Sequence, residues 1–404
     1  HGEGDAFMSK DSIRDDAFLD PSIVPATIHK PLSVDDADSI FVTGTTGFLG
    51  AFLLDELLRT THQDAKIYCL VRVKNGTPEE ALDRVINNLK YYQLYDYELE
   101  NRIVPVVGDL KEIYFGLPYG QYSELAEKID YIFHCASLVN YIYSYSDIKP
   151  STVDGTREIL RFACTSVTKP LSYISTNGVF PRGNEIPYLE TSDIDAFAEQ
   201  LEEGYSQAKW VAERLAWQAI SRGLPVSIYR PGNIGHHSVT GIANPKDFQA
   251  MIIDACAKVN CAPRKVDWKF EMTPVDVLVK AIRLFASQPS YLGTVFNVFQ
   301  NNPMPAREVF DLMLDNQVIS EAVPVDDWKS RLRSKAASDG DYILNVLDQS
   351  LEGIQSHLHN NGKFDCAAFE SALAKYNINW PSLDIDYFHK ALLANTVSLG
   401  SRHR

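Results

Sequence analysis

Short apolar runs alternate with amphipathic stretches along most of this chain. The runs are almost continuously apolar, which is typical of strands buried on both faces of a sheet. The stretches between them repeat apolar positions every three or four residues, the period of a helix packed on a sheet. This pattern predicts strands at Ser39–Thr43, Lys66–Val71, Ile103–Val107, Tyr131–Cys135, Leu171–Ser175, Val226–Tyr229 and Thr294–Val298. It predicts helices around residues 51–59, 78–91, 153–166, 205–221 and 276–287.

The alternation predicts the fold class. Strands that alternate with helices form a parallel sheet covered by helices on both faces. We therefore expect an α/β chain with a Rossmann-type, doubly wound parallel sheet. After Arg230 the alternation becomes irregular, and a smaller, mainly helical C-terminal lobe is expected. Ligands bind at the carboxyl edge of such a sheet, so we expect the lobe to close over that edge and bind substrate.

A glycine-rich turn, Thr43–Gly50, joins the first strand to the first helix. Gly44 permits the tight turn, Gly47 lets the backbone approach a pyrophosphate, and Gly50 lets helix and strand pack closely. The helix begins with free N–H groups and the positive end of its dipole, which favour an anion. We interpret this turn as a dinucleotide site rather than an ordinary glycine loop. Its remaining predicted cofactor contacts are Thr46, Phe48 and Leu49.

The end of the second strand indicates which dinucleotide binds. NAD-binding versions of this fold place an acidic residue there for the ribose 2′-hydroxyl, whereas an arginine accommodates a 2′-phosphate. This chain has Arg72 there, and we expect Arg84 on the following helix to point to the same place. Both could instead be solvated surface arginines. The pattern favours NADPH over NADH.

The ends of the other strands supply further candidate cofactor contacts. Asp109 after the third strand could accept a hydrogen bond from the adenine amino group. Small residues follow the fourth strand, where the backbone must pass the cofactor, and the segment after the sixth strand is expected beside the nicotinamide. His134 reads as a packed strand histidine with no assigned role. The predicted contacts are Asp109, Leu110, Ala136, Ser137, Pro231, Gly232 and Ile234.

Three residues form the candidate catalytic set. Tyr205 and Lys209 are four residues apart on one predicted helix and so share a face. A tyrosine of pKa ~10 is a poor acid at neutral pH, and a nearby ammonium stabilises the phenolate and lowers that pKa. Lys209 could also bind the ribose hydroxyls of the cofactor. Thr176 ends the fifth strand, where its hydroxyl can bind a substrate carbonyl oxygen, with Ser175 as the competitor for that role.

Each of these assignments has a structural alternative. The Tyr-x-x-x-Lys spacing occurs by chance on exposed helix faces, and a threonine at a strand end commonly makes a turn hydrogen bond. The glycine turn upstream favours the catalytic interpretation.

Composition restricts the class of protein. The 404 residues are enough for about two domains, and the formal net charge of −15 argues against a nucleic-acid binder. None of the six cysteines lies in a C-x-x-C pair, so we expect free thiols in a reducing compartment and no metal site. No apolar run approaches the ~20 residues that cross a bilayer. These features favour a cytoplasmic protein with neither nucleic-acid nor membrane partners.

The motifs resemble those of the extended short-chain dehydrogenase/reductases. More narrowly, the chain is similar to the thioester reductase (R) domain of carboxylic acid reductases and nonribosomal-peptide-synthetase-like enzymes. The resemblance covers residues 15 to 300 well and the C-terminal lobe loosely. Its motifs are Thr43–Gly50, Leu70–Arg72, Gly108–Leu110, His134–Asn140, Ser175–Thr176, Tyr205–Trp210 and Arg230–Ile234.

The resemblance implies a reaction, a partner and a domain plan. A carrier domain, in the same polypeptide, would present an acyl thioester on its phosphopantetheine arm, and NADPH would reduce it with Thr176, Tyr205 and Lys209. The product would be an aldehyde, or an alcohol after a second reduction. Residues 1–37 would be the linker from the carrier domain, and 38–234 with 271–300 the NADP-binding Rossmann domain. Residues 235–270 and 301–404 would form the substrate-binding lobe.

One segment departs from the family pattern. Extended members often have an Asn-Val-x-Gly-Thr motif after the fourth strand, where this chain has Thr152–Thr156. The helix is expected there, but a proton-relay role for the missing asparagine is in doubt.

Two other functions remain open. The chain could be an extended reductase that acts on a free ketone, an aldehyde or a sugar nucleotide. It could also be a noncatalytic NADP-binding regulator, although such a protein would not need Thr176, Tyr205 and Lys209 together.

Overall fold

The computed structural model describes residues 10–136, 139–140, 142–359 and 362–401. Its centre is a seven-stranded parallel sheet in the order β11-β6-β5-β4-β1-β2-β3. This confirms the doubly wound α/β fold, and the order reverses between β1 and β4 at the centre of the sheet. The strands are β1 (Ser39–Thr43), β2 (Lys66–Val71), β3 (Ile103–Val107), β4 (Tyr131–His134), β5 (Leu171–Ile174), β6 (Val226–Pro231) and β11 (Val295–Val298).

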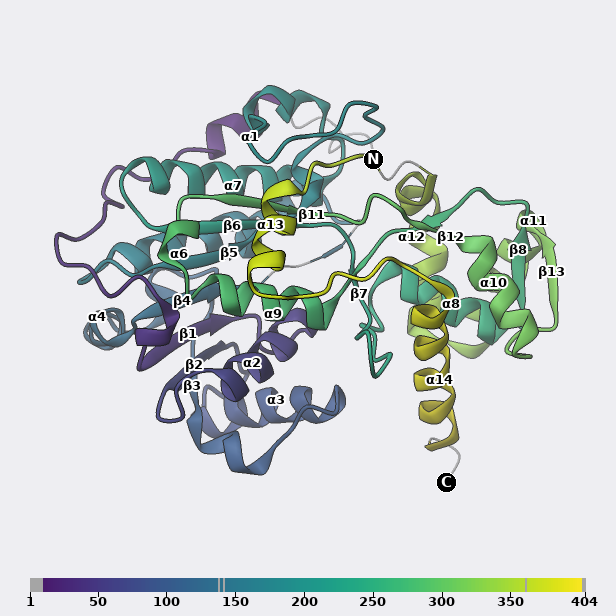
Figure 1. Cartoon of the computed structure of the whole chain (residues 1–404), viewed down its shortest axis with the longest axis horizontal. Coiled ribbons are helices and arrows are strands. Elements are labelled where there is room, and N and C mark those ends of the chain that lie inside the picture. Colours follow the sequence, from purple (N-terminus) through teal and green to yellow (C-terminus); the bar gives the residue numbers. More distant parts are fainter. Residues whose placement is uncertain (1–9, 137–138, 141, 360–361, 402–404) are drawn as a thin grey trace.

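Helices surround this sheet and build a second lobe beside it (Figure 1). They are α1 (Lys10–Asp16), α2 (Phe48–Thr60), α3 (Pro78–Tyr91), α4 (Tyr119–Lys128), α5 (Tyr145–Lys149), α6 (Gly155–Cys164), α7 (Gly204–Ser221), α8 (Phe248–Val259), α9 (Val275–Phe285), α10 (Ala306–Asp315), α11 (Val325–Asp339), α12 (Tyr342–His359), α13 (Ala367–Lys375) and α14 (Ile385–Ser401). Three two-stranded sheets pair β7 (Ile234–Gly235) with β10 (Thr273–Pro274), β9 (Lys269–Phe270) with β12 (Met304–Pro305), and β8 (Cys261–Arg264) with β13 (Glu321–Pro324).

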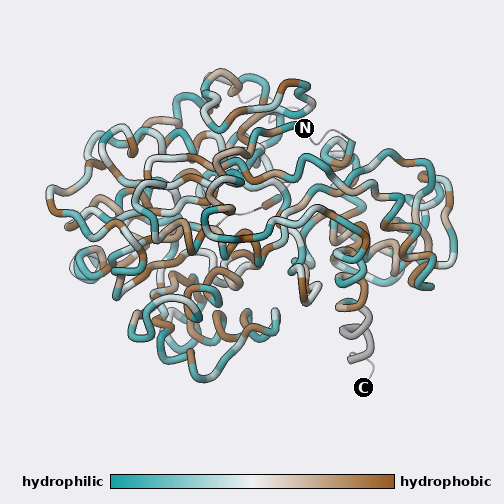
Figure 2. Tube along the Cα trace, viewed as in Figure 1, coloured by the Kyte–Doolittle hydropathy of each residue, from teal (hydrophilic) through white to brown (hydrophobic). Residues whose placement is uncertain are grey.

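The apolar strands are buried on both faces because their side chains alternate between two cores. In β2, Tyr68 and Leu70 face the core that also contains α6 and α7. Ile67, Cys69 and Val71 face the opposite core, with α2, α3 and α9. Figure 2 shows stretches of hydrophobic residues, in brown, running through the larger lobe. A continuous apolar strand is therefore required wherever helices cover both faces.

The smaller lobe has a hydrophobic core of its own. Residues from α8, α10, α11, α12 and α14 form it, with Trp268 and Trp328 packed edge to face. Helix α13 does not belong to this core: Phe369 and Leu373 are buried with α9 and β11. The chain thus returns from the lobe to the sheet before α14 begins. The lobe boundaries given by the sequence remain a prediction.

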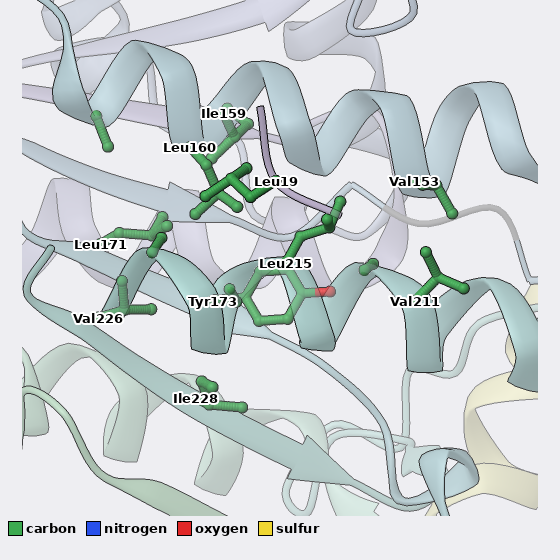
Figure 3. Close-up of a cluster of buried hydrophobic side chains, with 14 of the residues drawn as sticks. Leu19, Val153, Ile159, Leu160, Leu171, Tyr173, Val211, Leu215, Val226 and Ile228 are labelled. Carbon is green, nitrogen blue, oxygen red and sulfur yellow. The ribbon is translucent and has the colours of Figure 1, made fainter. Parts of the chain in front are cut away.

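The N-terminal segment after Lys10 packs on the Rossmann core. Leu19 is 0% exposed and lies among side chains of α6, α7, β5 and β6 (Figure 3). Helix α7 holds the backbone of this segment: Gln218 accepts from the Leu19 N–H at 2.8 Å, and Arg222 donates to the Leu19 carbonyl at 2.9 Å. Arg14 pairs with Asp195 just before α7. Residues 10–37, the part of the expected linker that the structure describes, thus pack on the folded core; we call this segment the strap.

Candidate functional site

The glycine turn after β1 has the geometry that the sequence predicted. Gly44 has φ +82°, a left-handed conformation that favours glycine. A Cβ on Gly50 would lie 1.9 Å from the Gly44 carbonyl oxygen, so helix and turn touch backbone to backbone. A Cβ on Gly47 would meet only that same oxygen, at 3.4 Å. The turn is therefore tight on its inner side and open at Gly47.

Hydrogen bonds from Asn88, which the sequence did not single out, and to Thr43 hold this turn in place. The Asn88 amide on α3 donates to the carbonyls of Thr45 and Gly47, both at 2.9 Å. Thr43 Oγ1 lies 2.7 Å from Nδ1 of the buried His134 and accepts from the Ala136 N–H at 3.1 Å. Burial lowers the pKa of His134 to about 3, so this imidazole is neutral and packed, as the sequence suggested.

The start of α2 can bind an anion. Gly47 is its N-cap residue and supplies no side-chain hydrogen bond to the helix. The first N–H groups of the helix, at Phe48 and Leu49, therefore have no side-chain cap, and Thr46 beside them is exposed. An open turn at Gly47 and an uncapped helix N-terminus fit the pyrophosphate of a dinucleotide.

The two candidate phosphate-binding arginines lie together at the end of β2. Both side chains are exposed, and the Arg84 guanidinium donates to the backbone carbonyl of Arg72. Helix α3 thus brings Arg84 back to the strand end, as expected. The structure thus places two exposed cations together at the end of β2.

The remaining predicted cofactor residues lie at neighbouring strand ends. Asp109 Oδ1 accepts from the Lys111 N–H at 3.0 Å, which fixes the loop after β3. Leu110 packs against Gly155 at the start of α6. Ser137 lies outside the described residues.

The segment after β6 packs tightly against a buried carboxyl group. Pro231 ends β6, Gly232 follows it, and Ile234 lies in the short strand β7. A Cβ on Gly232 would lie 2.0 Å from Glu271 Oε1 and 3.0 Å from the Phe299 ring, so a larger residue would have to displace this buried carboxyl. Burial raises the pKa of Glu271 to about 8, and this carboxyl accepts from the Asn233 N–H at 3.1 Å.

Thr176 is buried directly after β5. Its Oγ1 accepts from the Gly178 N–H at 3.1 Å and caps a short 3-10 turn. This is the turn hydrogen bond that the sequence offered as the alternative role. That bond uses an oxygen lone pair, and the hydroxyl itself donates to Asn177 Oδ1 over a long 3.5 Å, a contact that a substrate oxygen can replace. Ser175 is also buried, and its N–H bonds the Tyr229 carbonyl at 2.7 Å.

Tyr205 and Lys209 lie in the first two turns of α7. Gly204 makes this start possible, because a Cβ there would lie 2.5 Å from the Tyr145 backbone nitrogen. Tyr205 is half-buried, and Lys209 is fully buried with its Nζ 2.9 Å from the Ile174 carbonyl oxygen. Burial lowers the pKa of Lys209 to about 8, against the opposing effect of Glu213.

The hydrogen bond from Lys209 links two of the candidate catalytic elements. Ile174 is the last residue of β5, two positions before Thr176. The ammonium therefore ties α7 to the strand that carries the threonine. A small cavity lined by Asn177, Gly178 and Phe364, among others, lies beside Thr176.

Other chemistry is limited in the part of the chain that the structure describes. The described histidines, cysteines and acidic residues form no group of three that could hold a metal ion. All six cysteines are free. Within the described ranges no helix combines the length and apolarity that crossing a membrane requires.

The family model described as "Male sterility protein" matches residues 42–282, more than half of the chain. The glycine betaine reductase ATRR of Emericella nidulans is 35% identical over 352 residues, which are 85% of this chain and 27% of that protein. The non-canonical nonribosomal peptide synthetase FrzA of a Cladobotryum species is 32% identical over 326 residues, 79% of this chain and 30% of that protein. The chain thus spans well under half the length of these relatives.

A solved structure matches over nearly the whole chain. It is the terminal R domain from the myxalamid PKS-NRPS biosynthetic pathway, with a TM-score of 0.87 and 36% identity. The match covers 97% of this chain and 98% of that one.

Proposed function

We propose that this chain reduces an acyl thioester carried by a carrier protein and releases the acyl group as an aldehyde. The chain belongs to the male sterility protein family and is an NAD(P)-dependent oxidoreductase. The observation that carries this proposal is the arrangement of Lys209, Ile174 and Thr176. The Lys209 ammonium bonds the end of the strand that leads to Thr176, and Tyr205 lies one helical turn before Lys209. A hydroxyl, a phenol and a buried ammonium thus come from adjoining elements at the carboxyl edge of the sheet.

Each of the three groups has a definite task. The hydroxyls of Thr176 and Tyr205 donate hydrogen bonds to the carbonyl oxygen as negative charge develops on it, which is where electrostatic stabilisation is most effective. Tyr205 then supplies the proton that this oxygen requires. Lys209 holds β5 in place and stabilises negative charge on the phenol oxygen. As the resulting hemithioacetal collapses, its hydroxyl proton returns to the Tyr205 phenolate and the C–S bond breaks. The pantetheine sulfur leaves as a thiolate that takes a proton from solvent, and the aldehyde is released.

The cofactor of this proposal is NADPH, which supplies the hydride when it is bound. Arg72 and Arg84 support the choice of NADPH, because two guanidinium groups at the end of β2 can bind the 2′-phosphate. The uncapped start of α2 and the open side of Gly47 would bind the pyrophosphate. Asp109 would bind the adenine, and Ala136, Pro231, Gly232 and Ile234 would line the path of the nicotinamide.

The proposed partner is an upstream carrier domain in the same polypeptide. The names of the relatives support it: one is a nonribosomal peptide synthetase, and the matching structure is a terminal R domain of a PKS-NRPS pathway. The docked strap before β1 would then set where a preceding domain sits relative to α7.

The proposal is tested with the chain, NADPH and an acyl-pantetheine thioester. We expect loss of the reduced-cofactor absorbance and one aldehyde per NADPH, trapped as a hydrazone. Reduction of free ketones with no reaction on thioesters would assign the chain to another extended reductase activity. Tight NADPH binding without turnover on any carbonyl would indicate a regulator.

Tyr205→Phe tests the catalytic group directly. Losing a general acid should reduce kcat by roughly 10²–10⁴-fold. NADPH affinity, measured by cofactor fluorescence, should stay within a factor of about two of that of the unmutated chain. The matched control is Tyr97→Phe, since Tyr97 is 79% exposed and outside the site. Loss of cofactor binding in Tyr205→Phe would mean that the residue is structural.

A further inference from the structure

A buried ion pair lies one helical turn beyond Lys209. Glu213 on α7 is 0% exposed and Arg230 on β6 is 1% exposed. Arg230 Nε donates to Glu213 Oε1 at 2.8 Å, and its Nη2 donates to Oε2 at 2.9 Å. Trp217 Nε1 adds a third hydrogen bond to Oε2 at 3.2 Å. These donors fix the carboxylate in one position.

Burying such a pair is costly. Removing two charges from water requires free energy that their mutual attraction often fails to recover, and an apolar pair of similar size is frequently as stable. A gain in folding stability is therefore a weak explanation for the buried Glu213–Arg230 pair. A second role for the Glu213 carboxylate charge explains it better. Its position on α7 indicates what that role is.

Lys209 and Glu213 are four residues apart on α7, so their side chains lie on the same face of the helix. Lys209 is buried, with one hydrogen bond to the Ile174 carbonyl and its Nζ over the Tyr173 ring at 5.3 Å from the centroid. A carbonyl and a ring face are weak partners for a full positive charge. The Glu213 carboxylate is the fixed negative charge on the same helix face.

We propose that Glu213, held in place by Arg230, is a positioning residue that keeps Lys209 protonated beside Tyr205 and Thr176. The inference rests on the proposed function, in which the Lys209 ammonium supports the reduction. Arg230 would act one step further away, by fixing the orientation of the carboxylate.

The electrostatic environment of Lys209 supports this role. Burial lowers the pKa of its ammonium to about 8, and the Glu213 carboxylate opposes that effect. Burial also raises the pKa of the Cys135 thiol to about 12 and lowers that of His134 to about 3, so both stay neutral near pH 8. Burial likewise raises the pKa of Tyr173. Among the groups that act on the Lys209 ammonium, Glu213 is therefore the carboxyl group that favours it, and Arg230 is the ion-pair partner of that carboxyl.

The test removes the charge of Glu213 without leaving an unpaired arginine. Glu213→Gln alone leaves the buried Arg230 guanidinium without its carboxylate partner and could unfold the chain. The principal variant is therefore the double change Glu213→Gln with Arg230→Met. The control neutralises a second pair, Asp130→Asn with Lys30→Met, whose atoms lie 2.9 Å apart at the amino ends of β1 and β4, the edge of the sheet opposite the site. Both proteins are assayed as NADPH complexes with an acyl-pantetheine thioester from about pH 6 to 10.

We expect the alkaline limb of kcat/KM to move down by about one pH unit or more in the Glu213/Arg230 variant, because a nearby carboxylate no longer favours the ammonium. The control should keep the wild-type profile. NMR of protein labelled with ¹³C at the lysine ε-carbons, with the Lys209 signal assigned by Lys209→Met, should show the same downward shift in titration midpoint. This readout separates Lys209 from the Tyr205 phenol.

An unmoved alkaline limb together with an unmoved Lys209 titration in the double variant would overturn the inference. Lys209→Met distinguishes this result from failure of the proposed function. If Lys209→Met reduces thioesters at the wild-type rate, both ideas are overturned. If Lys209→Met is inactive while the double variant behaves as wild type, only the role of Glu213 is overturned.

Discussion

Shortening one side chain, Leu19→Ala, tests whether the strap before β1 is part of the folded core. Leu19 is 0% exposed and packs between α6 and α7 in the cluster of Figure 3. Removing a fully buried leucine side chain loses its transfer free energy and leaves a cavity, which together cost about 2–5 kcal/mol in other proteins. The backbone of the strap remains bonded to Gln218 and Arg222 and limits how far the site can collapse. We therefore expect a loss of about 3 kcal/mol.

The assay is urea-induced unfolding followed by tryptophan fluorescence, because Trp210 and Trp217 lie on α7, the helix whose Gln218 and Arg222 bond this segment. A loss of that size corresponds to a fall in Tm of roughly 6–12 °C at 2–4 °C per kcal/mol. The neighbouring residue supplies the control: Phe18 is 73% exposed, and Phe18→Ala should change stability by less than about 0.5 kcal/mol. Equal, small effects of the two changes would refute the reasoning and restore the interpretation of this segment as a loose linker.

Three further predictions concern the turn, the cofactor and a buried carboxyl. Gly50→Ala puts a Cβ 1.9 Å from the Gly44 oxygen and should weaken NADPH binding more than about tenfold by calorimetry, whereas Gly353→Ala, with open space around it, should not. Arg72→Ala should raise the Kd of NADPH roughly 10–100-fold while that of NADH changes less than about twofold, and equal losses would contradict the 2′-phosphate role. Burial raises the pKa of Glu271 from 4.5 to about 8, so its stabilising contribution is complete below pH 4.5 and is lost as the pH rises to about 8. Relative to Glu271→Gln, the wild type should therefore lose roughly 1.4 kcal/mol per pH unit over that window in urea unfolding, and parallel pH profiles would count against this.

The sheet was predictable because its strands are buried on both faces. A continuous apolar run such as Lys66–Val71 is required there, and its limits coincide with those of β2. Gly44 and Gly50 were predictable for a similar reason, since the backbone at both positions leaves no space for a side chain. The local sequence reveals these features because burial of a strand, or lack of space at a turn, restricts the residue type at that very position.

Contacts between distant segments could not be predicted in this way. Leu19 lies in a stretch rich in Asp and Pro, and nothing in its neighbours indicates that α6 and α7 leave a place for it. Arg230 opens one of the family motifs, but nothing in the local sequence pairs it with Glu213; the ion pair forms only because the fold brings α7 against β6. The sequence offered two roles for Thr176, a substrate contact and a turn hydrogen bond. The two are compatible, because a hydroxyl can accept one hydrogen bond and donate another.

The return of α13 to the sheet limits how this protein can be redesigned. The chain leaves the larger lobe after β7, comes back at β10, leaves again at β12, comes back at α13 and leaves once more for α14. Exchanging the smaller lobe for that of a relative would therefore require cuts at each of these crossings. Point changes within the smaller lobe avoid these cuts and leave the connections between the two lobes intact.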